Sequence, residues 1–266
     1  MAGFPAFQLP PPDADGRRFG ISVLEQLEQF RKRLIRSAIG ILVGMLIAFA
    51  FIERIVAFVL EPARRMLPPG SKLIFTEPIE AFSLYIDIAL LAGAVIAAPY
   101  VFYQFWLLIA PALYSRQKKF AIPFVALTTI GAVLGAAFSH YIVFPYMIAF
   151  FGTFSSEDVA FLPRVEDTYD LYVKMLLGMV VVFQIPTVVF FLAKMGMVTW
   201  RFLWRNIKYA ILIIFIVSAV VTPSSDPWNQ TIFAAPMILL YLLSIVIAWL
   251  VAPAKVEPTL IIPGDE

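Results

Sequence analysis

Long apolar stretches, separated by charged or proline-rich segments, constrain this chain more than any other feature. A helix needs about 20 consecutive apolar residues to cross a hydrocarbon core of roughly 30 Å. Six stretches approach or exceed that length, at residues 34–52, 81–112, 120–151, 169–192, 207–221 and 231–252. Hydrophobic residues make up 61% of the chain and charged residues only 14%, so a bilayer is the expected solvent. The sequence predicts an all-α integral membrane protein with six transmembrane helices.

The six stretches differ in length, and this predicts their geometry. The second and third would overshoot the bilayer at about 1.5 Å per residue, so we expect tilts or kinks, with Pro99 and Pro145 as kink sites. The fifth, with only about 15 residues, extends roughly 22 Å. Around these spans we expect a disordered tail over 1–20, a loop over 53–80 and a C-terminal tail over 253–266, leaving one membrane domain over 21–252.

An amphipathic segment, residues 22–33, precedes the first span. Ser22 and Glu25 have the spacing of a capping box, and apolar residues follow at helical spacing on one face. The other face is polar and includes Glu28 and Lys32, which are spaced for an i,i+4 ion pair. We expect a helix at the cytoplasmic surface that runs into the first span.

The distribution of Lys and Arg between alternate loops predicts the topology. Fourteen of the 20 basic residues lie in the segments that share a side with the two termini, and basic residues favour the cytoplasmic side. The second span also ends in a run of Tyr, Phe and Trp followed by Arg116, Lys118 and Lys119, a pattern typical of a helix leaving the membrane. Both termini are therefore expected in the cytoplasm.

Residue types that carry chemistry are scarce. The chain has no cysteine and a single histidine, His140, which we interpret as an interfacial residue near the outer end of the third span. We find no Gly-x-Ser-x-Gly elbow, glycine-rich phosphate loop or intramembrane aspartate pair. We therefore expect no enzymatic activity, no cofactor and no metal site.

Two polar residues within the apolar stretches need an explanation. Asp87 lies about two turns into the second span, where it either serves a function or reaches the interface. Gln184 lies at mid-depth of the fourth span, and Pro186 frees a carbonyl one turn before it. The amide can bond within its own helix or dock a helix of another protein. A six-span small-solute or ion transporter that uses Asp87 and Gln184 stays open as one functional class.

Five short motifs occur in a characteristic order. They are QLEQFRKRL (26–34), EPARRMLPPG (61–70), YQFWLLIAPALY (103–114), FQIP (183–186) and TPSSDPWNQT (222–231). In this order and spacing they resemble the TatC family, the multi-span component of the twin-arginine protein translocase. The resemblance extends over about residues 22–252.

This resemblance implies a concave, glove-like scaffold in the cytoplasmic (inner) membrane of a bacterium or archaeon. It implies a non-enzymatic receptor that binds twin-arginine signal peptides of folded cargo at the cytoplasmic face. It further implies that the receptor assembles single-span TatA- or TatB-type subunits, in contact with membrane lipid, into an oligomeric complex driven by the proton-motive force. Nucleic acid is not among the implied partners.

The resemblance also implies roles for individual residues. The signal-peptide site would comprise Glu28, Gln29, Arg31, Leu108 and Gln117, with Gln184 in contact with partner helices and Pro62 and Asp226 in an outer cap. At Gln29 and Gln117 the family usually has carboxylates, and an amide accepts from Arg without the added strength of a charge. Our hypothesis is that Glu28 takes over part of this role. The alternative is a diverged family member without twin-arginine selectivity.

Overall fold

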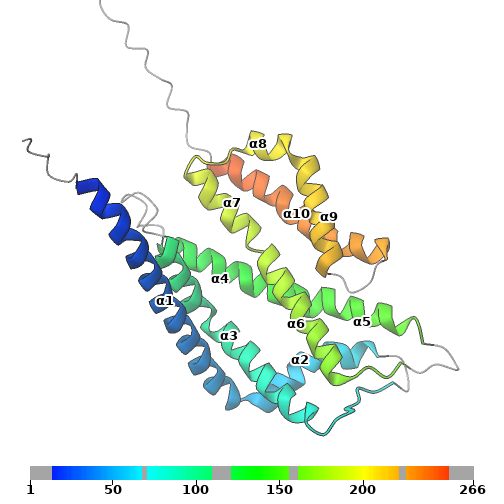
Figure 1. Cartoon of the computed structure of the whole chain (residues 1–266). Coiled ribbons are helices and arrows are strands. Elements are labelled where there is room, and N and C mark those ends of the chain that lie inside the picture. Colours follow the sequence, from blue (N-terminus) through cyan, green and yellow to red (C-terminus); the bar gives the residue numbers. More distant parts are fainter. Residues whose placement is uncertain (1–13, 68–70, 110–120, 156–160, 222–225, 252–266) are drawn as a thin grey trace, which may run out of the picture.

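The computed structural model describes residues 14–67, 71–109, 121–155, 161–221 and 226–251 (Figure 1). The helices are α1 (Ala14–Phe49), α2 (Ile52–Met66), α3 (Glu80–Ile109), α4 (Ala121–Phe138), the π-helix η3 (Ser139–Val143), α5 (Phe144–Gly152), α6 (Val165–Val182), α7 (Ile185–Lys194), α8 (Trp200–Arg205), α9 (Ile207–Val221) and α10 (Pro227–Val251). The β-structure of the described part is an isolated parallel bridge between Ile74 and Arg164. The all-α prediction is confirmed.

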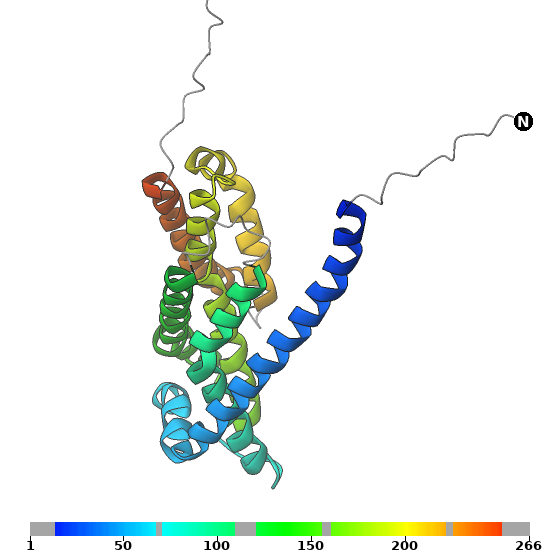
Figure 2. The ribbon, with the colours of Figure 1, turned by 90° about the vertical axis from the view of Figure 1, so that its left-hand side faces the viewer.

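The helices form an elongated bundle. Figure 1 shows α1 and α3 side by side along one flank, and α7 to α10 gathered at the opposite flank. Between them α4 packs on both α3 and α6. In the orthogonal view the N-terminal half of α1 leans away from the rest of the bundle (Figure 2).

Four helical segments are long and apolar enough to cross a membrane: Glu80–Leu108, Ile122–Gly152, Val165–Lys194 and Gln230–Val251. The pair Leu27–Phe49 and Ile52–Met66 meets at a bend of 92° and raises the number to five if it forms one span. The apolar helix Ile207–Val220 is shorter. The multi-span character is confirmed, and the number of six spans stays a prediction.

Two regions expected to lack regular structure are helical. α1 begins at Ala14, so residues 14–20 do not belong to a disordered tail. No proline follows Pro12 before the end of α1, and the amphipathic segment 22–33 continues into the span without a break. α2 occupies half of the expected loop 53–80. Its Val56 and Val59 are buried on one face against the core, and burial of such a face stabilises short helices.

Small residues let neighbouring helices approach closely. Gly44 of α1 and Gly93 of α3 meet backbone to backbone, and a Cβ atom at either position would overlap the opposite helix. Four residues earlier in α1, a Cβ on Gly40 would lie 2.8 Å from the ring of Tyr100. In α4, a Cβ on Gly135 would meet the backbone of α6. Because lipid provides no hydrophobic force between membrane helices, such close contacts drive their association.

The third span changes helix type at η3. Pro145 has no N–H to donate to the preceding turn, and a π-helix inserts one residue into an α-helix, often at functional positions. The kink expected at Pro145 thus takes the form of η3, whereas α3 continues through Pro99. Within η3, Ser139 is 0% and His140 is 4% exposed. His140 therefore lies inside the bundle, and its expected depth near the membrane interface stays a prediction.

Two buried clusters hold the bundle together, and α6 contributes to both. The first joins residues of α2, α3, α5 and α6, among them Ile88 and Phe144. The second joins η3, α5, α6, α9 and α10 around Met179, Phe233 and Met237. α6 therefore fixes the position of the α1–α3 flank relative to the α9–α10 flank.

Candidate functional site

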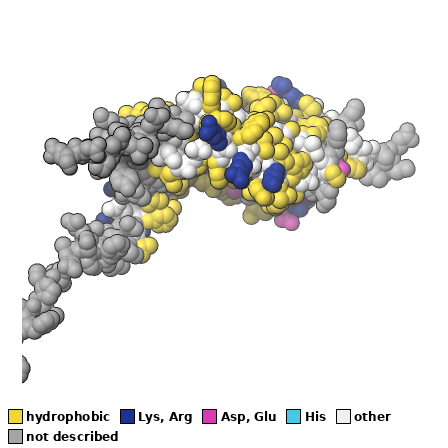
Figure 3. All heavy atoms as spheres, turned by 90° about the horizontal axis from the view of Figure 1, so that it is seen from above, with side chains coloured by type: hydrophobic (Ala, Val, Ile, Leu, Met, Phe, Trp, Pro, Cys, Tyr) yellow, Lys and Arg dark blue, Asp and Glu magenta, His cyan; other side chains and the backbone are white. Residues whose placement is uncertain are grey.

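One end of the molecule carries mainly basic side chains, and we call it the basic end. There α1 begins, α3 ends and α8 lies (Figure 1). Its described basic residues are Arg31, Lys32, Arg33, Arg36, Lys194, Arg201, Arg205 and Lys208. Seen from above, basic side chains stand out from a largely hydrophobic surface (Figure 3). Charges at the opposite end are mixed, as Glu61 with Arg65 and Arg164 with Glu166 illustrate.

Both faces of the amphipathic part of α1 are exposed, the polar one as well as the apolar one with Leu27 and Phe30. Glu28 and Lys32 form the expected i,i+4 ion pair with 2.7 Å between Oε1 and Nζ, and both side chains are more than 60% exposed. Gln29 and Arg31 are exposed as well. Exposed pairs of this kind contribute little to stability, so Lys32 can be displaced from Glu28 at little cost.

The helix that neighbours this segment is α3. Because Gly44 faces Gly93 and Gly40 faces Tyr100, α1 and α3 are antiparallel, and Leu108 lies at the basic end. Leu108 is half-buried. Gln117 lies outside the described residues. The structure thus places four of the five predicted signal-peptide residues at one end of two adjacent helices. Among the described residues, no hydrogen bond or ion pair connects Leu108 on α3 with the three residues on α1.

Two buried polar atoms between these helices were not foreseen. Gln104 on α3 is 5% exposed, and its Oε1 has no hydrogen-bond partner among the described residues. Nη1 of Arg33 on α1 is also a buried atom without a hydrogen-bond partner among the described residues. Buried acceptors and donors normally find partners. The sequence signal was available, because Gln104 is an amide in an apolar helix just as Gln184 is.

A cluster of aromatic side chains joins the end of α3, the start of α4 and α7. Trp106 of α3 is 3% exposed, and its ring centroid lies 4.7 Å from Phe124 of α4 and 5.8 Å from Phe191 of α7. Tilted pairs of this type are worth about 0.5–1.5 kcal/mol beyond their buried area. Trp106 therefore anchors the bundle, while Tyr100 and Tyr103 on the same helix remain exposed.

Gln184 lies at the break between α6 and α7. Its Nε2 donates to the carbonyl of Thr128 on α4 at 3.2 Å and to that of Val180 at 3.3 Å. The amide thus bonds internally, although not to the carbonyl one turn before Pro186. Its Oε1 is buried without a hydrogen-bond partner in the described part of the chain, so half of the amide remains available.

Replacing Gln184 with leucine should lower stability modestly. The change removes one hydrogen bond to Thr128 on α4 and one to Val180 in the same span, and hydrogen bonds between membrane helices are worth about 0.6 kcal/mol on average. We expect the midpoint of thermal unfolding in detergent to fall by about 2–4 °C. Val181→Leu is the control, because Val181 is 67% exposed on the same turn. An unchanged midpoint for Gln184→Leu would mean that these bonds do not hold the helices together.

The two outer-cap residues occupy different elements. Pro62 lies inside α2 and is buried. Asp226 directly precedes α10, and its backbone carbonyl accepts a hydrogen bond from the backbone N–H of Gln230 at 3.1 Å. The Gln230 side chain donates to the Phe215 carbonyl at 2.7 Å, which ties α10 to α9. The structure therefore places Pro62 in the first cluster and Asp226 at the start of the last helix.

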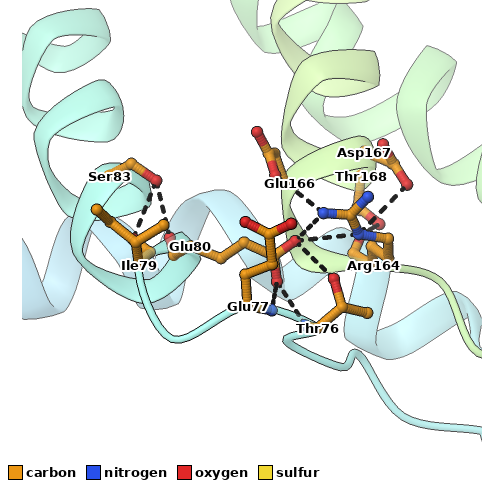
Figure 4. Close-up of polar contacts among 9 residues, drawn as sticks. All are labelled: Thr76, Glu77, Ile79, Glu80, Ser83, Arg164, Glu166, Asp167 and Thr168. Carbon is orange, nitrogen blue, oxygen red and sulfur yellow. Dashed lines mark hydrogen bonds and ion pairs between the residues drawn. The ribbon is translucent and has the colours of Figure 1, made fainter.

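A polar clamp joins the starts of α3 and α6 at the mixed-charge end (Figure 4). Glu80 is 3% exposed and accepts from Arg164 Nε at 3.0 Å, with a second ion-pair contact to Nη2. The backbone amide of Thr76 donates to the other carboxylate oxygen at 2.6 Å. Bonding to Glu80 raises the pKa of Arg164 above its ordinary value. The Ile74–Arg164 bridge reinforces the same junction.

The remaining ionisable groups offer little chemistry. Asp87, considered above for transport, is exposed on α3. Among the residues that the structure describes, no three His, Cys, Asp or Glu side chains are grouped so that they could hold a metal ion.

The comparisons with known proteins agree on one family. Residues 25–236 match the family described as Sec-independent protein translocase protein (TatC). A relative of that name from Koribacter versatilis is 40% identical over 237 residues, covering 88% of this chain and 87% of the relative. One from Aquifex aeolicus is 35% identical and covers 88% and 97%.

The solved structures lead to the same family. A crystal structure described as the twin arginine translocase receptor TatC superposes with a TM-score of 0.71 at 33% identity. The match covers 85% of this chain and 99% of that one.

The long apolar helices define a multi-pass helical membrane protein. The family match over most of the chain is more specific, and the chain belongs to the TatC family. It is a component of the Sec-independent, twin-arginine protein translocase and not an enzyme. Membership excludes the small-solute transporter that Asp87 and Gln184 had left open.

Proposed function

We propose that this protein is the signal-peptide receptor and assembly scaffold of its translocase. It binds twin-arginine signal peptides of folded cargo at the basic end and gathers single-span TatA- or TatB-type subunits into an oligomeric complex driven by the proton-motive force. The description of the matched crystal structure as a receptor supports this proposal.

The proposal includes the topology of the chain. Six spans, with α9 as the short fifth, place both termini in the cytoplasm of a bacterial or archaeal cell. The basic end then faces the cytoplasm, in accordance with the preference of Lys and Arg for that side. In this arrangement α2 lies along the opposite membrane surface and, with Asp226, caps a concave scaffold; the bend of 92° between α1 and α2 supports it.

The observation that carries the proposal is the exposed carboxylate of Glu28 at the basic end. A guanidinium can bond a carboxylate through two parallel hydrogen bonds, which an ammonium cannot do. The present partner, Lys32, makes a weak exposed pair, so an incoming Arg can replace it. Gln29 and Arg31 flank Glu28 on α1, and Leu108 on α3 offers an apolar contact for the peptide.

Gln104 adds an acceptor for the same ligand. Its Oε1 is buried and unpaired among the described residues. Gln104 falls a turn before Leu108, on the same helical stripe as Gly93 and Tyr100, which meet α1. Together with Gln117, which lies outside the described residues, it would compensate for the missing carboxylates through neutral acceptors. In the same way, the unpaired Oε1 of Gln184 would accept from a polar group on a partner's transmembrane helix.

The test is binding of a labelled signal peptide to the purified protein in lipid nanodiscs, with Arg-Arg and Lys-Lys versions compared. We expect tighter binding of the Arg-Arg peptide. Glu28→Ala should weaken binding of the Arg-Arg peptide severalfold, because the two-point contact between the guanidinium and the carboxylate is lost. Lys32→Ala should strengthen binding because it frees Glu28.

Two results would contradict this receptor site. Equal affinity for the two peptides, in protein of normal thermal stability, would favour the diverged family member without twin-arginine selectivity. An equal loss of binding in Glu28→Ala and in Glu166→Ala, which alters an exposed acid at the other end, would show that only overall charge matters. Gln184→Leu should leave peptide binding intact and reduce co-purification of the single-span subunits.

A further inference from the structure

A second site lies between α2, α3, α6 and the α4–η3 junction, toward the mixed-charge end. It is a cavity of about 440 Å³ with almost wholly apolar walls, including Val59, Ile88, Ala92 and Ala137. This volume lies within the roughly 300–1,000 Å³ typical of ligand pockets. It adjoins the largest buried cluster, where close packing would normally leave no such space.

The polar wall of the cavity is His140. The π-helix turns this ring inward, where Phe58 stacks on it with centroids 4.1 Å apart and planes 11° from parallel. Its Nδ1 lies 3.1 Å from the hydroxyl of Tyr172. When that hydroxyl donates to Nδ1, the neutral ring carries its proton on Nε2. Because His140 lines the cavity, this N–H is able to donate to a molecule bound there.

The rim of the cavity is open to the outside of the bundle. Val95 and Ile96 of α3 are 47% and 48% exposed, and Tyr141 is 67% exposed. In a membrane protein this apolar surface faces lipid. The occupant that this opening admits is therefore a molecule with an apolar chain, entering sideways from the bilayer.

A smaller cavity of about 110 Å³ continues toward the end of the molecule. It shares His140 and Tyr141 with the large one and adds Glu61 and Arg65 of α2. These two side chains form an ion pair, with each partly exposed. Along one path there are thus an apolar chamber, the imidazole of His140, and a cation next to an anion.

We propose that this path binds one phospholipid with a zwitterionic, amine-bearing headgroup of the ethanolamine type. One acyl chain fills the large cavity, an ester carbonyl accepts from His140 Nε2, the phosphate contacts Arg65 and the ammonium contacts Glu61. Two other lipid classes fit less well. A free fatty acid would bring its carboxylate toward the like-charged Glu61, and an anionic phospholipid would offer Glu61 no positive group. The lipid fills the space under α2 and fastens that helix to α3 and η3. This inference does not depend on signal-peptide binding.

The experiment uses phosphatidylethanolamine with a photoactivatable diazirine in one acyl chain, in nanodiscs containing the full-length protein. We expect the cross-links to concentrate on the cavity walls, in residues 88–96 and 136–141. In Ala137→Phe the ring occupies the chamber, and labelling there should fall by about tenfold. Val133→Phe is the matched control, because it adds the same ring to an exposed position of α4 and should leave labelling unchanged.

A second measurement examines the headgroup. Adding phosphatidylethanolamine to protein in detergent should raise the unfolding temperature of the native protein by mass action, more than phosphatidylglycerol or oleic acid does. Glu61→Gln should remove this preference, and Ala137→Phe the whole effect. Labelling spread evenly over all lipid-facing helices of the native protein would overturn the proposal. Equal stabilisation by the three lipids would overturn the assigned headgroup contacts.

Discussion

Replacing Gly93 with leucine is expected to prevent α1 from docking on α3. Any Cβ at this position collides with the backbone of α1 at Gly44 and Met45, and backbone cannot rotate away as a flexible side chain does. Overpacking of a core costs about 1–3 kcal/mol, and more where the neighbours cannot give way. Because folded proteins are only marginally stable, we expect little or no folded protein in the membrane fraction.

The control for this prediction lies two residues away. Val95→Leu also enlarges a side chain of α3, but Val95 is 47% exposed, so expression and the unfolding temperature should stay close to those of the native protein. Fluorescence-detected size exclusion of both variants makes the comparison. A sharp, native-like peak for Gly93→Leu would show that the two helices can separate without loss of the fold.

Hydropathy was enough to predict the long apolar helices, because a span must satisfy its own backbone hydrogen bonds within lipid. The same hydropathy criterion missed α2, because its charged residues and Pro62 lower the average hydropathy of the segment. Only its buried face, with Val56 and Val59, shows that α2 packs on the bundle. An amphipathic helix is recognised by its one apolar face, as residues 22–33 were.

Contacts between distant residues could not be predicted from one sequence. Nothing near Glu80 indicates that its partner is Arg164, 84 residues away, and Pro145 predicted a kink but not that it would take the form of a π-helix at His140. These features depend on how the helices pack. At the candidate site, the i,i+4 spacing did predict the Glu28–Lys32 pair, because both residues lie on one helix. Gln104 could have been found by the reasoning applied to Gln184.

The two ends of the molecule therefore differ in construction. At the mixed-charge end, the clamp at Glu80, the β-bridge and the cavity under α2 connect helices through many contacts. At the basic end, α1 leans away from the bundle (Figure 2), and buried polar atoms of Arg33 and Gln104 lack partners within the described chain. Such an arrangement suits a site that takes up a peptide between elements anchored elsewhere.

Replacing Arg164 with alanine is expected to lower the unfolding temperature by several degrees and to loosen the segment 71–79. The change leaves the Glu80 carboxylate, 3% exposed, with amide and hydroxyl donors from Thr76 and Glu77 but without a positive charge. Removing one partner of a buried ion pair destabilises more than the pair contributes. Arg164→Lys should fall in between, because an ammonium keeps the charge and loses the two-point geometry.

A double-mutant cycle separates this clamp from simple loss of charge. If Glu80 and Arg164 interact directly, then Glu80→Leu with Arg164→Leu should cost much less than the sum of the two single changes, since no unpaired buried charge remains. Arg54→Ala, at an exposed position of the same end, should have little effect. Thermal unfolding and limited proteolysis near residues 71–79 provide the measurements. Additive losses would mean that each residue acts through its own helix, and that the starts of α3 and α6 are joined by the apolar cluster alone.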